Sequence, residues 1–276
     1  MNNGATSRCP DCPTFEVKYP GIVSCPICGL GKTTTATRAP EHQDYLREGE
    51  CGGQARPAYF AGLFSKYFRN RPVGRSLDIG CGRGEMVAAF ERERWTAHGI
   101  DAFRGFQADG KRFFRADLAT YEPKERYDVI SLVHAFEHMP DPIGALDRVR
   151  AMLNPDGLLL LVVPNFGGVW SRLLGERWHM LKPEDHLFHY TPRGLSNVVE
   201  RCGFQIQAVN TYSGYAPSPW QIKLAERRFY EHGIGARVPV RPIVFRTNAW
   251  LRPAWNWIID RRLQGAEIQL LAAKLT

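Results

Sequence analysis

The stretch Arg75-Ser-Leu-Asp-Ile-Gly-Cys-Gly-Arg-Gly-Glu-Met86 sets the fold class of this chain of 276 residues. A short apolar strand, Leu77 to Ile79, leads into glycines at positions 80, 82 and 84, and helix-forming sequence follows at once. Glycine is needed where the chain turns with positive φ or where a ligand touches the backbone. A strand, a glycine turn and a helix N-terminus direct N–H donors and a positive dipole end towards one point. The stretch therefore predicts a binding site for a nucleotide-like ligand.

The spacing of the glycines separates this site from a dinucleotide fingerprint. In G-x-G-x-x-G, the third glycine counted from Gly80 would fall at position 85, which is Glu85. Here Asp78 lies two residues before Gly80, and the pattern is D-x-G-x-G-x-G. This pattern favours a ligand with a carboxylate and an ammonium group, such as the methionine end of S-adenosylmethionine. A glycine turn that binds nothing is the alternative.

Short apolar strands alternate with helical sequence after Arg75, which predicts an α/β fold with a doubly wound parallel sheet. The strands expected after the first are Trp95–Ile100, Phe113–Ala116, Tyr127–Val133, Leu158–Val163, Phe204–Val209 and a last one at Ala266–Ala273. The expected helices are Arg56–Phe68, Pro142–Leu153 and Thr191–Cys202.

Two aspartates follow neighbouring strands of this predicted sheet. Asp101 ends the second strand and could accept hydrogen bonds from both ribose hydroxyls of a nucleotide. Asp117 ends the third strand and could accept one from an adenine amino group. A turn or cap role is the alternative for each. Two acids at successive strand ends beside the glycine loop favour ligand contacts.

Four of the seven cysteines form two C-x-x-C pairs, Cys9 with Cys12 and Cys25 with Cys28. Two such pairs in one short segment predict a tetrahedral structural zinc site without an open position for a catalytic water. Redox dithiols are the alternative, but that motif comes singly on a βαβ unit. We therefore divide the chain into a zinc-binding module (1–32), a linker (33–55) and a main domain (56–276).

Composition is that of an ordinary soluble globular protein, with 44% hydrophobic and 23% charged residues. The longest apolar run, Leu158 to Val163, is far shorter than a membrane span. No apolar segment of a signal peptide follows the N-terminal residues. A cytoplasmic protein is therefore expected.

Several motifs carry a family likeness. They are Leu77–Glu85, Gly99-Ile-Asp101, Ala116-Asp-Leu118, Phe136-Glu-His-Met-Pro-Asp-Pro142 and Leu153-Asn-Pro-Asp-Gly157. Together they resemble class I S-adenosylmethionine-dependent methyltransferases. The segments Cys25–Leu30 and Asp185–Pro192 look like bacterial small-molecule members with an N-terminal zinc-knuckle module, similar to ubiquinone-type O-methyltransferases.

The resemblance implies a Rossmann-like sheet of seven strands whose last strand is antiparallel. It also implies that the glycine loop surrounds the methionyl group of the cofactor, with His134 beside the sulfonium. The implied cofactor-binding residues are Asp78, Gly80, Cys81, Gly82, Gly84, Asp101, Ala102, Asp117, Leu118 and His134.

The ubiquinone-type enzymes place an acid three residues before a Glu-His pair and hold a divalent cation with this set. Here His134 takes that place ahead of Glu137 and His138, so the use of a cation is left open. The same letters match the H-x-x-E-H signature of some zinc peptidases. That signature needs both histidines on one helix, whereas these follow a strand and run into Pro140 and Pro142.

Methyl transfer from a sulfonium is mostly a matter of positioning, and a hydroxyl acceptor also needs a general base. His138 and His186 are the candidate bases, with His134 and Glu137 completing the catalytic set. The sequence thus predicts a methyltransferase acting on a small molecule, by O-methylation of a sugar, polyketide or quinone-like hydroxyl.

Two other functions are compatible with parts of the sequence. An RNA methyltransferase could use the zinc module and a basic insertion, but the Asn-Pro-Pro-Tyr type of motif is replaced by His134-Ala-Phe-Glu137, so nucleic acid is not expected as a partner. A non-catalytic module that binds S-adenosylmethionine is the third interpretation. The oligomeric state cannot be read from the sequence.

A basic, aromatic helical insertion is predicted at 210–263, before the last strand. Its part at 220–262 holds four of the seven tryptophans. The favoured interpretation is a cap over the acceptor pocket or a dimer contact. Peripheral contact with an anionic membrane surface is the alternative.

Overall fold

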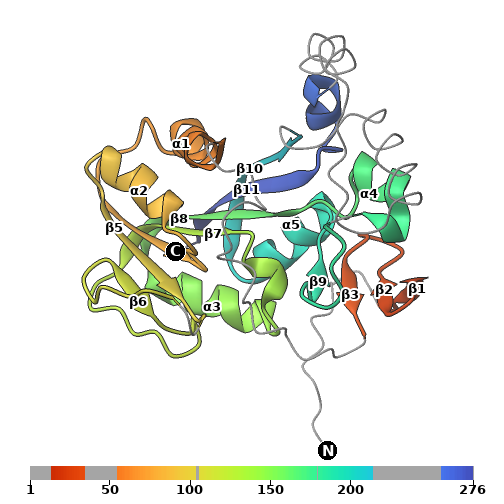
Figure 1. The fold of residues 1–276 in the computed structure, drawn as a ribbon, viewed down its shortest axis with the longest axis horizontal. Helices are drawn as coiled ribbons and strands as arrows, with labels where there is room; N and C mark the ends of the chain where they lie inside the picture. Colours follow the sequence, from red (N-terminus) through yellow and green to blue (C-terminus); the bar gives the residue numbers. More distant parts are fainter. Residues whose placement is uncertain (1–13, 35–54, 104–105, 179, 214–255, 276) are drawn as a thin grey trace, which may run out of the picture.

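The computed structural model describes residues 14–34, 55–103, 106–178, 180–213 and 256–275. Two sheets organise these residues (Figure 1). The large sheet has seven strands in the order β10-β11-β8-β7-β4-β5-β6, and a small sheet has four in the order β1-β2-β3-β9. The predicted Rossmann-like sheet of seven strands is confirmed.

The large sheet is parallel except for one strand. Its members are β4 (Arg75–Ile79), β5 (Thr96–Asp101), β6 (Phe113–Arg115), β7 (Tyr127–Val133), β8 (Leu153–Pro164), β10 (Phe204–Tyr212) and β11 (Glu267–Lys274). The pairs among β4, β5, β6, β7 and β8 are parallel, whereas β11 lies antiparallel between β8 and β10. The antiparallel last strand implied by the resemblance is therefore present.

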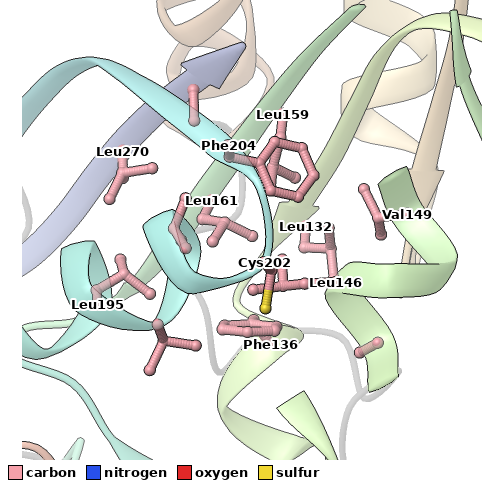
Figure 2. Packing of buried hydrophobic residues seen from close by; sticks show 14 of the residues in the cluster. Leu132, Phe136, Leu146, Val149, Leu159, Leu161, Leu195, Cys202, Phe204 and Leu270 are labelled. Atoms are coloured by element: carbon pink, nitrogen blue, oxygen red, sulfur yellow. The ribbon is translucent and has the colours of Figure 1, made fainter. Parts of the chain in front are cut away.

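Helices cover both faces of the large sheet (Figure 1). Helices α1 (Ala55–Tyr67) and α2 (Glu85–Arg92) lie on one face, and α3 (Pro142–Met152) and α5 (Pro192–Arg201) lie on the other. Strand β8 is apolar on both sides because it contacts both helical layers. Its alternate residues Leu159 and Leu161 pack with Leu132, Leu146 and Leu195 on the α3 and α5 side (Figure 2).

The small sheet joins the N-terminal segment to the main domain. Strands β1 (Glu16–Tyr19), β2 (Ile22–Ser24) and β3 (Gly31–Thr33) form an antiparallel meander, and β3 also pairs with β9 (Phe188–His189). The predicted module boundary at 32 thus falls inside β3. The Thr191 hydroxyl, which caps α5, donates a hydrogen bond to the carbonyl of Cys28.

Short helices complete the described fold: η1 (Phe136–His138), α4 (Val169–Leu174) and η2 (Gly175–Arg177). Of the predicted insertion, 210–212 belong to β10 and 256–261 are helical, while 214–255 lie outside the described residues, as do Cys9 and Cys12. Within the described ranges, no helix combines the length and apolar character needed to cross a membrane.

Candidate functional site

The glycine loop follows β4, the strand that lies between β5 and β7. Gly80, Gly82 and Gly84 have φ values of 70°, 51° and 77°, in the left-handed region that glycine adopts without strain. The N–H groups of Gly80 and Cys81 donate to the Ile100 carbonyl, at 2.9 and 3.1 Å. Two of the N–H donors of the loop therefore bond to the end of β5, and ligand binding by the remaining donors stays a prediction.

Asp101 ties the loop to β5. Its Oδ2 accepts a hydrogen bond from Gly82 N at 3.0 Å, and its Oδ1 accepts one from Phe103 N at 2.9 Å. Asp117 Oδ1 likewise accepts from Ala119 N at 2.8 Å, inside its own turn. Both carboxylates thus have the turn role weighed as the alternative. Their cofactor contacts stay predictions.

A hollow lies where these predictions place the nucleoside. Its volume is about 490 Å³, and Ala102, Arg115, Ala116 and Asp117 line it. Ala102 and Asp117 come from the predicted cofactor set. The hollow follows the ends of β5 and β6, the edge at which open α/β sheets bind their ligands.

Asp78 is buried in β4, next to the glycine loop. Ser131 Oγ of β7 donates to its Oδ1 at 2.7 Å. Burial raises the pKa of Asp78 to about 7, against the opposing effect of the Ser131 hydrogen bond. The carboxyl group therefore takes up a proton in the folded protein at a pH where it is ionised in the unfolded chain.

This raised pKa makes folding stability depend on pH. Between the ordinary pKa of 3.8 and the folded value of about 7, the native state binds the proton more tightly, so the free energy of unfolding should fall as the pH rises through this window. Asp78→Asn cannot ionise but keeps an acceptor for Ser131. Urea titrations of both proteins across this window should show a shallower decline for Asp78→Asn, and parallel curves would contradict the expectation.

The segment after β7 contacts the glycine loop directly. His134 has a φ of 54°, and its N–H donates to the Val162 carbonyl at 2.8 Å. A Cβ built on Gly80 would lie 2.6 Å from the Cβ of Ala135. The loop predicted to hold the cofactor and the segment predicted to carry catalytic residues therefore lie against each other at Gly80 and the side chain of Ala135.

His134 lies between two buried carboxylates. Its Nε2 is 3.3 Å from Glu267 Oε2, and its Nδ1 is 3.6 Å from Glu137 Oε1. Burial lowers the pKa of His134, but hydrogen bonding and charge from the two glutamates raise it to about 10. The raised pKa favours the imidazolium form at neutral pH, and the catalytic role of His134 stays a prediction.

Glu137, His138 and His186 form a second group, which we call the acceptor cluster. One ligand atom from each lies within 4.8 Å of the others. Glu137 and His186 are only 1% and 4% exposed. Burial lowers the pKa of His186 to about 4, whereas Asp185 and Glu137 raise that of His138 against the effect of burial. The structure thus brings together all four predicted catalytic residues.

Long-range hydrogen bonds hold His186 in this cluster. Leu187 N donates to the Glu137 carbonyl at 2.9 Å, which ties the 182–187 segment to η1. From the other side, the Thr33 hydroxyl donates to the His186 carbonyl at 2.7 Å and lies 3.1 Å from His189 Nε2. Strand β3 of the N-terminal segment is therefore part of the wall behind the cluster.

Sequence reasoning missed three residues of this site. Asp185 contacts His138 Nδ1 through its carbonyl at 3.1 Å and its Oδ1 at 3.2 Å. Glu267 accepts from the Tyr59 hydroxyl at 2.5 Å in addition to its contact with His134. An acid at the start of an apolar strand was the available signal for Glu267. No local sequence signal identifies Tyr59 as a site residue, because it fits the apolar pattern of α1.

The chain is similar in sequence to known methyltransferases. A family model described as a methyltransferase domain matches residues 53–209. A ubiquinone biosynthesis O-methyltransferase of Aeromonas salmonicida is 26% identical over 184 residues, 60% of this chain and 73% of that protein. The enzyme of that name from Actinobacillus pleuropneumoniae serotype 5b is 29% identical over 38% of this chain. That alignment spans only 48% of the relative's length.

Another relative and two solved structures complete the comparison. A trans-aconitate 2-methyltransferase of Rhizobium leguminosarum is 29% identical over 38% of this chain and 44% of that protein. An S-adenosylmethionine-dependent methyltransferase from Archaeoglobus fulgidus superposes with a TM-score of 0.52 at 19% identity, over 79% of this chain and 94% of that one. An S-adenosylmethionine-dependent methyltransferase from Thermotoga maritima superposes with a TM-score of 0.52 at 14% identity, over 79% of this chain and 89% of that one. These structures show the fold alone.

Proposed function

This chain belongs to the methyltransferase-domain family and has the fold of its class I, S-adenosylmethionine-dependent members, and from that premise we propose that it methylates a hydroxyl group of a small molecule. One observation carries the proposal. Glu137 and His138 of the acceptor cluster follow Ala135 in the chain, and Ala135 lies against Gly80 of the predicted cofactor loop. A group that accepts a proton then lies beside the expected position of the methyl donor.

S-adenosylmethionine, when bound, supplies an electrophilic methyl group. Transfer forms the O–CH₃ bond as the C–S bond breaks, and the sulfonium leaves as a neutral thioether. The hydroxyl proton must go to a base, and an unprotonated imidazole suits this role. His138 is 19% exposed on its side chain, so it lies at the accessible side of the cluster, and Asp185 holds its Nδ1. Family relatives named as O-methyltransferases support a hydroxyl acceptor.

The N-terminal segment supports a structural role better than nucleic-acid binding. Its described part pairs with β9 and accepts a hydrogen bond from Thr191, so it packs onto its own chain. The N–H groups of Ile27 and Cys28 donate to Cys25 Sγ at 3.2 and 3.3 Å, as they would to a metal-bound thiolate. A zinc ion held by Cys9, Cys12, Cys25 and Cys28 remains our proposal.

A disulfide is the competing use of these thiols, because Cys25 is disulfide-bonded in the structure. Cys25 cannot be a zinc ligand and a disulfide partner at the same time. Zinc content of the protein purified under reducing conditions tests the proposed site: about one equivalent is expected with four thiolate ligands, and folded protein without bound zinc would refute it.

A turnover assay tests the proposed function. The full chain is incubated with methyl-labelled S-adenosylmethionine and a panel of phenols, sugars, amines and carboxylic acids. Label should enter hydroxyl compounds, and His138→Gln and His186→Gln should each slow this by ~100-fold or more, the usual worth of a general base. His98→Gln is the matched control, since His98 contacts Tyr127 and Phe114 outside the cluster. Transfer to amines or acids alone, or to no compound, would refute a hydroxyl acceptor.

A further inference from the structure

Two polar side chains are buried on the face of β11 that α1 covers. Glu267 and Gln269 are 6% and 2% exposed, and Tyr59 and Tyr67 of α1 donate hydrogen bonds to them. The same face of the strand continues with Leu271, which packs in the apolar cluster that includes residues of α1. Buried ionised groups can often be replaced by apolar ones without loss of stability, so stability alone does not explain this polar pair.

The polar pair lies at the edge of the sheet where the cofactor site is predicted. Strand β11 is antiparallel to β8, and Glu267 pairs with Pro164, the last residue of β8. The start of β11 therefore meets the carboxyl ends of the parallel strands, the edge at which open α/β sheets bind their ligands. Leu271 pairs with Leu160, away from this edge. On this face of β11, the polar side chains thus lie at the ligand edge and the apolar ones away from it.

Both carboxylate oxygens of Glu267 contact donors. Its Oε1 accepts from the Tyr59 hydroxyl at 2.5 Å and from Gln269 Nε2 at 2.8 Å, and its Oε2 lies 3.3 Å from His134 Nε2. Gln269 Oε1 in turn accepts from the Tyr67 hydroxyl at 3.0 Å. A connected buried network fixes its members, because each lost bond leaves a polar group unsatisfied. Helix α1 therefore holds the Glu267 carboxylate in place beside the His134 ring.

His134 connects this network to the glycine loop. Its φ of 54° is uncommon for a residue other than glycine, and its N–H donates to the Val162 carbonyl of β8 at 2.8 Å. A backbone in this region is maintained by its surroundings and is typical of functional positions. The next residue, Ala135, lies against Gly80, and the His134 side chain keeps 27% of its surface exposed. The ring is thus fixed by Glu267 and still accessible to a ligand beside the loop.

We propose that Glu267 is a positioning residue which, supported by Tyr59, holds the His134 ring in contact with the bound cofactor. Of the two carboxylates that face this ring, Glu267 is the closer, since Glu137 Oε1 is 3.6 Å from Nδ1. The inference rests on the proposed function for the placement of S-adenosylmethionine at the glycine loop, and it does not depend on which group accepts the methyl. Through Tyr59, helix α1 takes part in cofactor binding.

A double-mutant cycle on the affinity for S-adenosylhomocysteine tests this role. Isothermal titration of the full chain should show ~10-fold weaker binding in His134→Gln and in Glu267→Gln, about the worth of one hydrogen bond to a charged group. Because Glu267 acts through the His134 ring, the double variant should also bind ~10-fold more weakly, whereas independent effects would multiply to ~100-fold. Multiplied effects in the double variant, or wild-type affinity in either single variant, would overturn the proposal.

Tyr59→Phe and Tyr67→Phe form a matched pair in the same helix. Each removes one hydroxyl from the network, but the Tyr59 hydroxyl donates to Glu267 and that of Tyr67 to Gln269. Tyr59→Phe should weaken binding about 5-fold, the worth of one hydrogen bond, but not in the His134→Gln background. Tyr67→Phe should bind as the wild type does.

The tyrosine pair also covers a Glu267→Gln variant that fails to fold, because equal affinity of Tyr59→Phe and Tyr67→Phe would overturn the proposal without it. Circular dichroism identifies the folded variants. None of these affinities needs a methyl acceptor. A turnover assay without label in hydroxyl compounds would therefore refute the proposed function and leave the coupling of Glu267 with His134 as measured.

Discussion

Gly80→Ala should abolish measurable binding of S-adenosylhomocysteine and lower the free energy of unfolding by about 2–5 kcal/mol. The φ of Gly80 is 70°, a conformation that strains alanine, and the new Cβ would lie 2.6 Å from the Cβ of Ala135. The glycine loop and the segment that begins at His134 would have to separate. Because both are placed at the methyl-transfer site, one added methyl group should disturb the cofactor side and the acceptor side together.

Gly62→Ala is the matched control for this prediction. Gly62 lies in α1, and a Cβ built there meets no atom within 4 Å. Alanine should therefore raise the free energy of unfolding by about 0.5–1 kcal/mol, the cost of glycine inside a helix. Urea unfolding and isothermal titration with S-adenosylhomocysteine measure both variants. Unchanged affinity in Gly80→Ala would show that this loop does not hold the cofactor.

Asp101→Asn should weaken S-adenosylhomocysteine binding by ~10–100-fold, the worth of one lost hydrogen bond to a charged group. The two carboxylate oxygens of Asp101 accept from Gly82 N and Phe103 N. An asparagine keeps one acceptor and turns an amide N–H₂ towards the other donor, so either Gly82 N or Phe103 N loses its acceptor. Any contact of the carboxylate with ribose hydroxyls would be weakened by the same change.

Asp141→Asn is the control for Asp101→Asn. Asp141 caps α3 by accepting from Gly144 N at 3.0 Å, and asparagine caps helices equally well. Its affinity for S-adenosylhomocysteine should match that of the wild type by isothermal titration. An affinity of Asp101→Asn equal to that of this control would remove Asp101 from the predicted cofactor set.

Much of the fold could be predicted because its signals are local. Strand β7 has the predicted bounds, and β4, β5, α1 and α3 fall within two residues of theirs. Each combines a periodic apolar pattern with a clear stop, such as the glycine loop after β4 or Pro142 at the start of α3. The bounds of strand β8 differ most from the predicted Leu158–Val163. The strand begins at Leu153, because that residue pairs with Tyr127 across an irregular register, and it ends at Pro164.

The candidate site was predicted as a set of residues but not as an arrangement. His134, Glu137, His138 and His186 were all named in advance, yet nothing in their order separates a base from a hydrogen-bond donor. The pKa of His134 is raised because Glu137 and Glu267 both face its ring, and Glu267 comes from the far end of the chain. His186 joins Glu137 because strand β3 and η1 hold its segment from two sides.

The sheet class, the glycine turn and the helices around it follow from short-range pattern, because each depends on φ preferences and apolar spacing within about a dozen residues. The roles of the charged side chains do not. They depend on which carboxylate faces which imidazole after strands β7, β9 and β11 have packed together. Burial and these spatial neighbours then set the pKa of each histidine. Folding brings Glu267, Thr33 and His186 to the segment after β7, and that juxtaposition assigns each histidine its chemistry.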